Sequence, residues 1–425
     1  MTRSTFFAST RRAFVAGALG ASLGWALLGR RGQAQQRTRT GGKRPPADHC
    51  VILTMNGGMA QTDTFDPKPG TRNAGPLAAI DTAAPGLRFS ELLPRLAGEA
   101  RELAVIRSMV TSEGAHERAR YLLHTGYAPS GTVRHPDLGA LVAQGKHDEE
   151  FDLPAYVAVG GGGLGAGVLG VGYEPFRVAD PRQPVENLSY APGVNALRWQ
   201  RRRKLLTILE RRFLRRHPGE ETRGHTQVYE RADRLMHAAE VEAFSLAREP
   251  SGLREAYGQN PFGQGCLLAR RLVEAGVPAV EVQLGGWDTH QDNFTRNREL
   301  AAMLDAGLAS LLHDLRERDL LRKTLVLVLS EFGRTPGINA NEGRDHWTRG
   351  WSVVLAGGPV RGGQAVGATG RDGTQGVERP VCVPDLFASI FRALGIDPAR
   401  VNETPNGRPI RAVDAGGKVV GELFA

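Results

Sequence analysis

Residues 324–347, TLVLVLSEFGRTPGINANEGRDHW, show the pattern that decides the fold: an unbroken apolar run that passes at once into polar residues. The run 324–329 consists mainly of leucine and valine, which is typical of a strand buried on both faces of a sheet. Similar short runs occur at residues 50–55, 103–106, 155–159, 279–284 and 352–355. Helical periodicity between them, as at residues 261–275 and 296–318, predicts a mainly parallel sheet with helices on both faces, which is a three-layer α/β/α sandwich.

Two segments modify this prediction. Residues 279–284 include Glu281 and Gln283, so this strand is expected to be half exposed. Residues 177–249 carry no strand pattern and are expected to form a helical insertion. Within them, residues 198–217 place leucines on one stripe and arginines around the rest. We expect an amphipathic helix packed through its leucines, and the alternative is a face for a membrane surface or an anionic polymer.

The first 34 residues are predicted to be a twin-arginine signal peptide. Arg11 and Arg12 precede a largely uncharged run, and small residues at Gly32 and Ala34 suit cleavage near residue 35. The run is short and interrupted by glycines, so cleavage is expected rather than an uncleaved anchor or a lasting membrane span. Residues 35–48 then form a linker before one large domain, residues 49–425. We expect export by the twin-arginine machinery to the periplasm or the cell exterior.

The formal charge of +9 does not indicate a nucleic-acid partner. Five arginines and no acidic residue lie within residues 1–34, so removal of this segment lowers the charge by five, to +4. Several of the remaining basic residues belong to the linker, which leaves the domain nearly neutral.

The cysteines and the glycine-rich segment argue against a thiolate metal site and a nucleotide site. Cys50, Cys266 and Cys382 are too few and too scattered for a disulfide framework or a thiolate metal site. We expect buried free thiols, with a single bridge as the alternative. Residues 160–172, GGGGLGAGVLGVG, contain a GxGxxG match but no helix for it to open. This favours a surface loop or lid over a nucleotide site.

Polar residues follow the predicted strands where each strand ends, which is where open α/β sheets place their functional side chains. The candidates are Asn56, Thr111, Ser112, His116, Asp288, His290, Glu331, Arg334 and, just before the last strand, His346. The carboxylates and imidazoles among them suit one divalent ion such as zinc, manganese or iron; they are Asp288, His290, Glu331 and His346. The alternative is that Asp288 and His290 only brace a loop.

Long motifs surround these residues: MNGGMAQTDTFDPKPG from residue 55, GGWDTHQDNF from 285, LSEFGRTPGINANEGRDHW from 329, LAGGPVRGGQAVGATGRDG from 355 and RPVCVPDLFASIFRALGIDP from 379. Through them the chain, from about residue 51 to its C-terminus, resembles exported proteins of the domain of unknown function 1501 family. That family is similar to the alkaline phosphatase and sulfatase superfamily, so the resemblance implies an alkaline phosphatase-like fold and a metal site.

The resemblance also implies an altered metal site. Asn56 stands at the first acid of the superfamily, and Glu331-Phe332 stands at one of its Asp-His pairs. Asn56 lacks the charge of the acid and Phe332 lacks the imidazole, so a one-metal site is implied rather than a two-metal site. The ligands that remain are Asp288, His290 and His346.

The position of the nucleophile differs as well. Sulfatases carry it ten residues before the glycine of a Leu-Thr-Gly segment, and here Gly126 is that glycine. This register places His116 at the nucleophile and Arg120 at the arginine of the motif. His116 would attack the substrate, act as general base to a water, or bind the metal. Ser112 and Thr111 are the candidate nucleophiles if the register shifts.

From the residues and the resemblance together we expect a metal-dependent hydrolase of sulfate or phosphate esters, whose substrate is a small ester or a sulfated or phosphorylated glycan. Arg120 or Arg334 would hold the anion, and His116 would move the proton or attack. The alternative is a non-catalytic protein of the same fold that binds an anionic glycan or an envelope partner. The losses at Asn56 and Phe332 favour that alternative, whereas the many titratable groups favour the enzyme.

Overall fold

The computed structural model describes residues 44–425 except 147, 149, 187, 218–219, 375–377, 405 and 425, with no side chains described for 220–223. The chain divides into residues 1–42 and residues 43–425, and the following description concerns the second unit. The predicted signal peptide, with Arg11 and Arg12, lies outside the described residues, as does the linker up to residue 43.

An eight-stranded sheet forms the centre of this unit, in the order β12-β4-β11-β8-β1-β7-β5-β6. Its strands are β1 (His49–Met55), β4 (Leu103–Met109), β5 (Tyr156–Val159), β6 (Phe176–Val178), β7 (Ala279–Leu284), β8 (Thr324–Leu329), β11 (Trp351–Gly357) and β12 (Gln364–Val366). Strand β11 runs antiparallel to both of its neighbours, and the other pairs are parallel. The sheet is therefore mainly parallel, as predicted.

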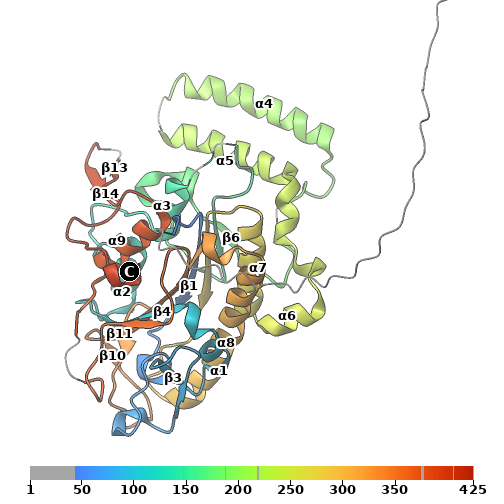
Figure 1. Cartoon of the computed structure of the whole chain (residues 1–425). Helices are drawn as coiled ribbons and strands as arrows, with labels where there is room; N and C mark the ends of the chain where they lie inside the picture. Colours follow the sequence, from blue (N-terminus) through green and yellow to red (C-terminus); the bar gives the residue numbers. More distant parts are fainter. Residues whose placement is uncertain are drawn as a thin grey trace, which may run out of the picture. The chain divides into compact units, whose positions relative to one another are not determined.

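Helices cover both faces of the sheet (Figure 1). One face is covered by α1 (Pro94–Glu99), α6 (Ser251–Tyr257), α7 (Pro261–Glu274) and α8 (Asn293–Glu317), and the other by α2 (His116–Thr125), α3 (Leu138–Gly145) and α9 (Val383–Leu394). Successive residues of β1 point to opposite faces, so that Val51 and Leu53 join one core while Cys50 and Ile52 join the other. Because both faces are buried, the strand is mainly apolar. The three-layer α/β/α prediction is confirmed.

Three two-stranded ribbons lie outside the main sheet. They are β2 (Ala79–Asp81) with β3 (Arg88–Ser90), β9 (Gly333–Arg334) with β10 (His346–Trp347), and β13 (Val401–Glu403) with β14 (Pro409–Arg411). In the second ribbon His346 pairs with Arg334. This pairing closes the connection between β8 and β11 into a hairpin at one edge of the sheet.

All six strand runs identified in the sequence are present, and the helices expected at residues 261–275 and 296–318 correspond to α7 and α8. The three-residue strands β6 and β12 were not predicted. The expectation that β7 is half exposed is wrong, because the side chain of Glu281 is 1% exposed. His124 contacts its carboxylate at 3.0 Å and Tyr156 donates to it at 2.7 Å, so the charge is buried with partners.

The region 177–249 contains α4 (Ala196–Leu214) and α5 (Glu220–His237), and it begins within β6. The prediction that the leucine stripe packs is wrong for Leu205, Leu209 and Phe213, which are exposed, whereas Leu206 and Leu214 are half-buried. Among the described residues, none of the helices is both long and apolar enough to cross a membrane.

The cysteines are free thiols, and the glycine-rich loop is held by hydrogen bonds to Asp137. Cys50 and Cys266 are buried free thiols, as predicted, and Cys382 is a half-buried free thiol. The buried carboxylate of Asp137 accepts hydrogen bonds from the N–H groups of Leu164 and Gly165 at 2.7 and 2.9 Å. It also caps α3 through the N–H of Ala140 at 2.8 Å. The loop is thereby held against the N-terminus of α3.

Candidate metal centre

The candidate site lies at the edge of the sheet where the parallel strands end. Strands β1, β4, β7 and β8 have their carboxyl ends at this edge, and antiparallel β11 begins there. The segments that follow β4, β7 and β8 carry His116, Asp288 and Glu331, and the segment that precedes β11 carries His346. Residues far apart in sequence are brought together in this way, as open α/β sheets usually do.

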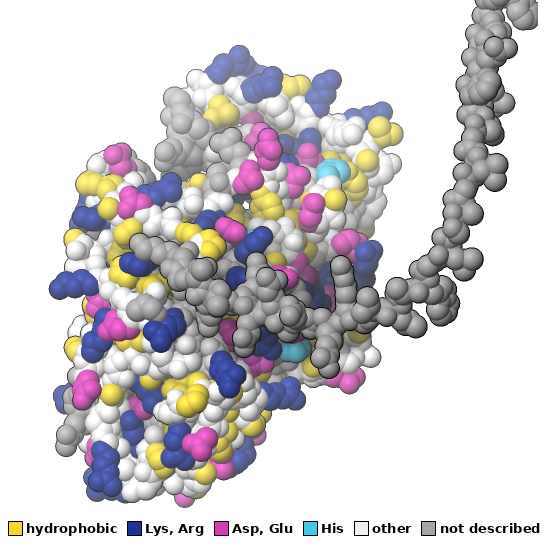
Figure 2. Space-filling model, in the orientation of Figure 1, with side chains coloured by type: hydrophobic (Ala, Val, Ile, Leu, Met, Phe, Trp, Pro, Cys, Tyr) yellow, Lys and Arg dark blue, Asp and Glu magenta, His cyan; other side chains and the backbone are white. Residues whose placement is uncertain are grey.

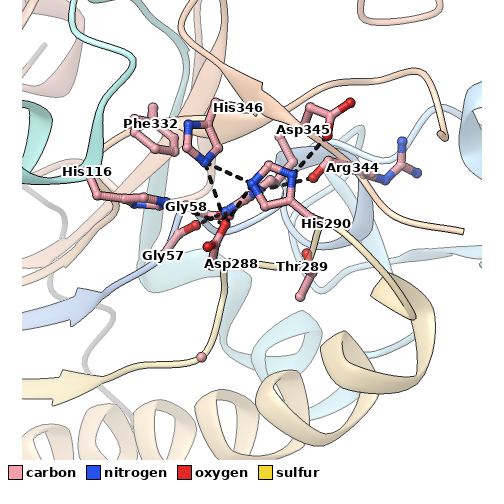
Figure 3. Close-up of polar contacts among 12 residues, drawn as sticks. Gly57, Gly58, His116, Asp288, Thr289, His290, Phe332, Arg344, Asp345 and His346 are labelled. Atoms are coloured by element: carbon pink, nitrogen blue, oxygen red, sulfur yellow. Dashed lines mark hydrogen bonds and ion pairs between the residues drawn. The ribbon is translucent and has the colours of Figure 1, made fainter. Parts of the chain in front are cut away.

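Three imidazoles converge on one carboxylate oxygen (Figure 3). Asp288 Oδ1 lies 3.4 Å from Nε2 of His116, 3.1 Å from Nε2 of His290 and 3.5 Å from Nε2 of His346. The ligand atoms of His116, Asp288 and His346 lie within 4.8 Å of one another. Ligands about 2.0 to 2.1 Å from a tetrahedral zinc ion are about 3.3 Å apart, so these spacings fit a shared divalent cation.

The other nitrogen of each ring faces an acceptor. Nδ1 of His116 lies 2.9 Å from Glu331 Oε1, and Nδ1 of His290 lies 2.8 Å from Asp345 Oδ1. Nδ1 of His346 lies 2.8 Å from the carbonyl oxygen of Gly114. These acceptors place the hydrogen of each neutral ring on Nδ1, which leaves a lone pair on each Nε2. This is the arrangement that outer hydrogen bonds give to metal-binding histidines.

The Nε2 atoms of the three rings lie close to one another at the centre of the cluster. Nε2 of His290 and Nε2 of His346 are 3.1 Å apart, and two lone pairs at that distance repel each other. Nε2 of His116 is buried and has no hydrogen-bond partner among the described residues. A proton or a metal ion at this point would remove the repulsion between His290 and His346 and would give Nε2 of His116 a partner.

The electrostatic environment favours the forms that bind metal at two of these residues. Burial has the largest influence on Asp288 and raises its pKa, but the hydrogen bond and charge of Arg334 with the charge of His116 outweigh it, so the net pKa is lowered. Burial lowers the pKa of His346. The hydrogen bond to Glu331 raises the pKa of His116. Asp288 is therefore ionised and His346 neutral near pH 7, as metal ligands must be.

Arg334 holds Asp288 from beneath the cluster. Its side chain is fully buried, and it donates to Asp288 Oδ1, to the carbonyl oxygens of Gly57 and Gly58, and to that of Arg344. Gly57 lets the backbone at Asp288 pack closely against it, because Gly57 has φ +115° and a Cβ there would lie 2.4 Å from the backbone nitrogen of Asp288. That Arg334 holds a substrate anion stays a prediction; in the structure its buried guanidinium is occupied by these four acceptors.

Phe332 fills the space beside the histidines. Its ring centroid lies 4.9 Å from that of His116 and 4.6 Å from that of His346. An apolar ring at this point supplies no metal ligand.

The sequence profile of the family described as "Protein of unknown function (DUF1501)" matches residues 47–424. The chain belongs to this family. None of the curated proteins matched this DUF1501 protein.

Several solved structures are similar to the DUF1501 protein, and three of them have the following identity, TM-score and share of each chain that is covered. The PsFucS1 sulfatase from Pseudoalteromonas sp. has 13% identity and a TM-score of 0.37, over 83% of this chain and 68% of that one. The phosphonate monoester hydrolase of Agrobacterium radiobacter has 14% identity and a TM-score of 0.35, over 89% and 77%. The lipoteichoic acid synthase LtaP from Listeria monocytogenes has 8% identity and a TM-score of 0.36, over 89% and 74%.

Four sequence candidates have no side-chain hydrogen bond or ion pair to the three histidines among the described residues: Asn56, Thr111, Ser112 and Arg120. The backbone of Asn56 joins the end of β1 to Leu284. The hydroxyl of Thr111 accepts from the N–H of Glu113 at 3.1 Å, and Ser112 is exposed. Arg120, one turn after His116 on α2, is half-buried, and its Nε has no partner.

A buried ion pair beneath the site was not predicted from the sequence. Arg344 donates to both carboxylate oxygens of Asp63, at 2.8 and 2.9 Å, and both side chains are 0% exposed. Asn293 and Asn297 also donate to Asp63, at 2.7 and 3.1 Å. Arg344 precedes Asp345 and His346, so the pair fixes the segment that carries them. The sequence places Asp63 after a strand but gives no sign of its partner.

Proposed function

We propose that this DUF1501 protein is an exported, metal-dependent hydrolase of sulfate or phosphate esters. One divalent cation, zinc, manganese or iron, would be held by Asp288 with the Nε2 atoms of His116, His290 and His346. Three imidazoles and a carboxylate suit these first-row ions. The observation that carries the proposal is the arrangement of the three rings: each Nδ1 faces an acceptor while each Nε2 faces Asp288.

The roles of the residues follow from this arrangement. A bound cation would polarise the ester oxygen and offset the charge that develops on it. Nε2 of His116 faces Asp288 within the cluster, which supports ligand binding over attack on the substrate. Among the described residues, no hydroxyl or thiol side chain contacts the three histidines. This favours attack by water over a covalent intermediate.

Arg120 is the side chain best suited to hold the anion of the substrate. It lies one helical turn after His116, and its Nε has no partner within the described part of the chain. An arginine with unused donors matches the oxygens of a sulfate or phosphate group. Arg334 remains beneath the cluster and keeps Asp288 ionised and in place.

Elemental analysis of protein purified without chelator tests the metal. We expect up to one zinc, manganese or iron per chain. The double variant His290→Ala, His346→Ala should lose this metal and melt at a lower temperature, because binding to the folded state alone stabilises it. His313→Ala is the matched control, since His313 is exposed on α8 and contacts Arg316 rather than the cluster. A chain that binds none of these ions would overturn the proposal.

Turnover of aryl sulfate and aryl phosphate esters, measured with each added metal, tests the reaction. Activity that depends on metal and is lost in His116→Ala supports the hydrolase. Metal binding without turnover under any ion supports the second candidate, a non-catalytic protein that binds an anionic glycan or an envelope partner. The specific observation in favour of that candidate is the apolar ring of Phe332 beside the histidines.

A further inference from the structure

Helix α4 presents an apolar face that no other described element covers. Five of its hydrophobic side chains are between 53% and 66% exposed: Leu197, Leu205, Ile208, Leu209 and Phe213. Its contacts with α5 use the opposite face. There Trp199 donates to Asp233, Glu210 contacts His225 at 3.0 Å, and Arg203 lies over the ring of Tyr229. Large apolar side chains exposed in a group mark an interaction surface.

The same face is strongly cationic. Between residues 198 and 216 the helix and its end carry eight arginines and one lysine, against a single acid. That acid, Glu210, is buried against α5 and paired with His225, so it does not offset the outer charges. Figure 2, in the orientation of Figure 1, shows Lys and Arg side chains over the region of α4 with hydrophobic side chains among them. The outer face therefore offers apolar contact and positive charge together.

We propose that the outer face of α4 binds the surface of an anionic phospholipid bilayer. An amphipathic helix lies in the interface with its apolar side chains at the boundary of the acyl chains, and its basic side chains reach the headgroups. Each arginine near such a surface adds to the attraction. Leu209 and Phe213 also border a groove with Arg212 and Arg216, where acyl and phosphate contacts would meet.

Two other occupants fit the face less well. A second copy of α4 would bring the same cluster of positive charges against itself, and like charges repel. An anionic polysaccharide would pair with the arginines but would leave five exposed apolar side chains without partners. A bilayer surface uses both properties of the helix.

Flotation of the full chain without residues 1–34 tests the proposal, with vesicles of phosphatidylcholine alone or mixed with phosphatidylglycerol. We expect binding to the mixed vesicles only. Replacing Arg201 and Arg212 by Gln should lower the partition coefficient about tenfold or more, since each arginine contributes about 1 kcal/mol. Replacing Leu205, Leu209 and Phe213 by Ser should lower it at least as much. All five side chains are exposed, so the fold should be kept, which an unchanged melting curve would verify.

Val401→Ser and Arg400→Gln are matched controls, because both residues are exposed and lie outside α4; they should bind vesicles like the unaltered chain. Equal binding to both vesicle types, or binding that survives both sets of α4 changes, would overturn the proposal. So would failure to bind vesicles together with self-association through α4. Retention on heparin that needs Arg201 and Arg212 but not the apolar residues, with no vesicle binding, would assign the face to an anionic polymer instead.

Discussion

Three hydrogen bonds at Nδ1 atoms orient the rings of the histidine cluster. Their acceptors differ in charge and in burial. Glu331 is buried and also accepts the N–H of Gly57 at 2.8 Å, so it is fixed by the backbone that follows β1. Asp345 is 56% exposed at its side chain, and the hydrogen bond with His290 lowers its pKa. A negative acceptor at Nδ1 makes Nε2 a better ligand, so these two carboxylates would support the proposed metal without touching it.

We predict that Asp345→Asn lowers metal affinity by about 10- to 100-fold, the usual cost of losing such a partner. The amide offers His290 a neutral acceptor, so the ring loses both orientation and basicity. Competition with a chelator, read by elemental analysis, gives the affinity. Asp319→Asn is the control, because the side chain of Asp319 is 89% exposed and its carboxylate contacts Arg322 rather than the cluster. Equal affinities in the two variants would show that Asp345 does not support His290.

Among the elements, β7 shows what a single sequence reveals and what it does not. Its boundaries follow from the apolar pattern, and so do the strands at residues 50–55 and 324–329. The burial of Glu281 could not be predicted, because its partner His124 is 157 residues away and belongs to α2. The reversed direction of β11 was not predicted either, since an apolar run carries no information about strand direction.

The same reasoning applies to the site. Position next to a strand identified Asp288, His290 and Glu331, which follow strands, and His346, which precedes one; the structure places all four at one edge of the sheet. The sequence could not show that Glu331 contacts His116 rather than the centre of the cluster. It also could not show that the side chain of Arg334 is buried beneath the cluster. Those facts depend on side-chain direction, which tertiary packing decides.

The ion pair between Glu281 and His124 gives a pH-dependent prediction for β7 and α2. Burial alone would raise the pKa of Glu281, but the charge and hydrogen bond of His124 outweigh it and lower the pKa to about 2. Burial alone would lower the pKa of His124, and Glu281 raises it overall. The contribution of Glu281 is lost as pH falls below 4.5 toward 2, and that of His124 is lost as pH rises above 6.5 through its raised pKa.

We therefore predict that Glu281→Gln costs about 3 to 5 kcal/mol of unfolding free energy at pH 5.5, since it removes the carboxylate that stabilises the charge of the buried His124. The cost should shrink at pH 9, because His124 loses its charge as the pH rises through its raised pKa. Urea unfolding at both pH values measures it, with the exposed Glu299→Gln as control. A double-mutant cycle with His124→Gln isolates the coupling. A cost that does not change with pH would mean that His124 is not charged in the folded protein.

For the whole molecule, export decides where the proposed activity takes place. The signal peptide is still a prediction, and it rests on Arg11 and Arg12 ahead of a short uncharged run. Replacing both by lysine should trap a full-length precursor in the cytoplasm, as seen by immunoblotting of cell fractions. Lysine at Arg30 and Arg31 keeps the same charges elsewhere in the segment and should leave processing intact. Unchanged export of the first variant would exclude the twin-arginine route.

The sequence separation of its members affects when the cluster forms during folding. His290 and His346 are 56 residues apart, whereas His116 and Glu331 are 215 residues apart. Contacts over long sequence separations form late, because the chain between them must first be ordered. The complete set of ligands therefore exists only in a chain that has finished folding, and the metal would serve as a chemical marker of that last step.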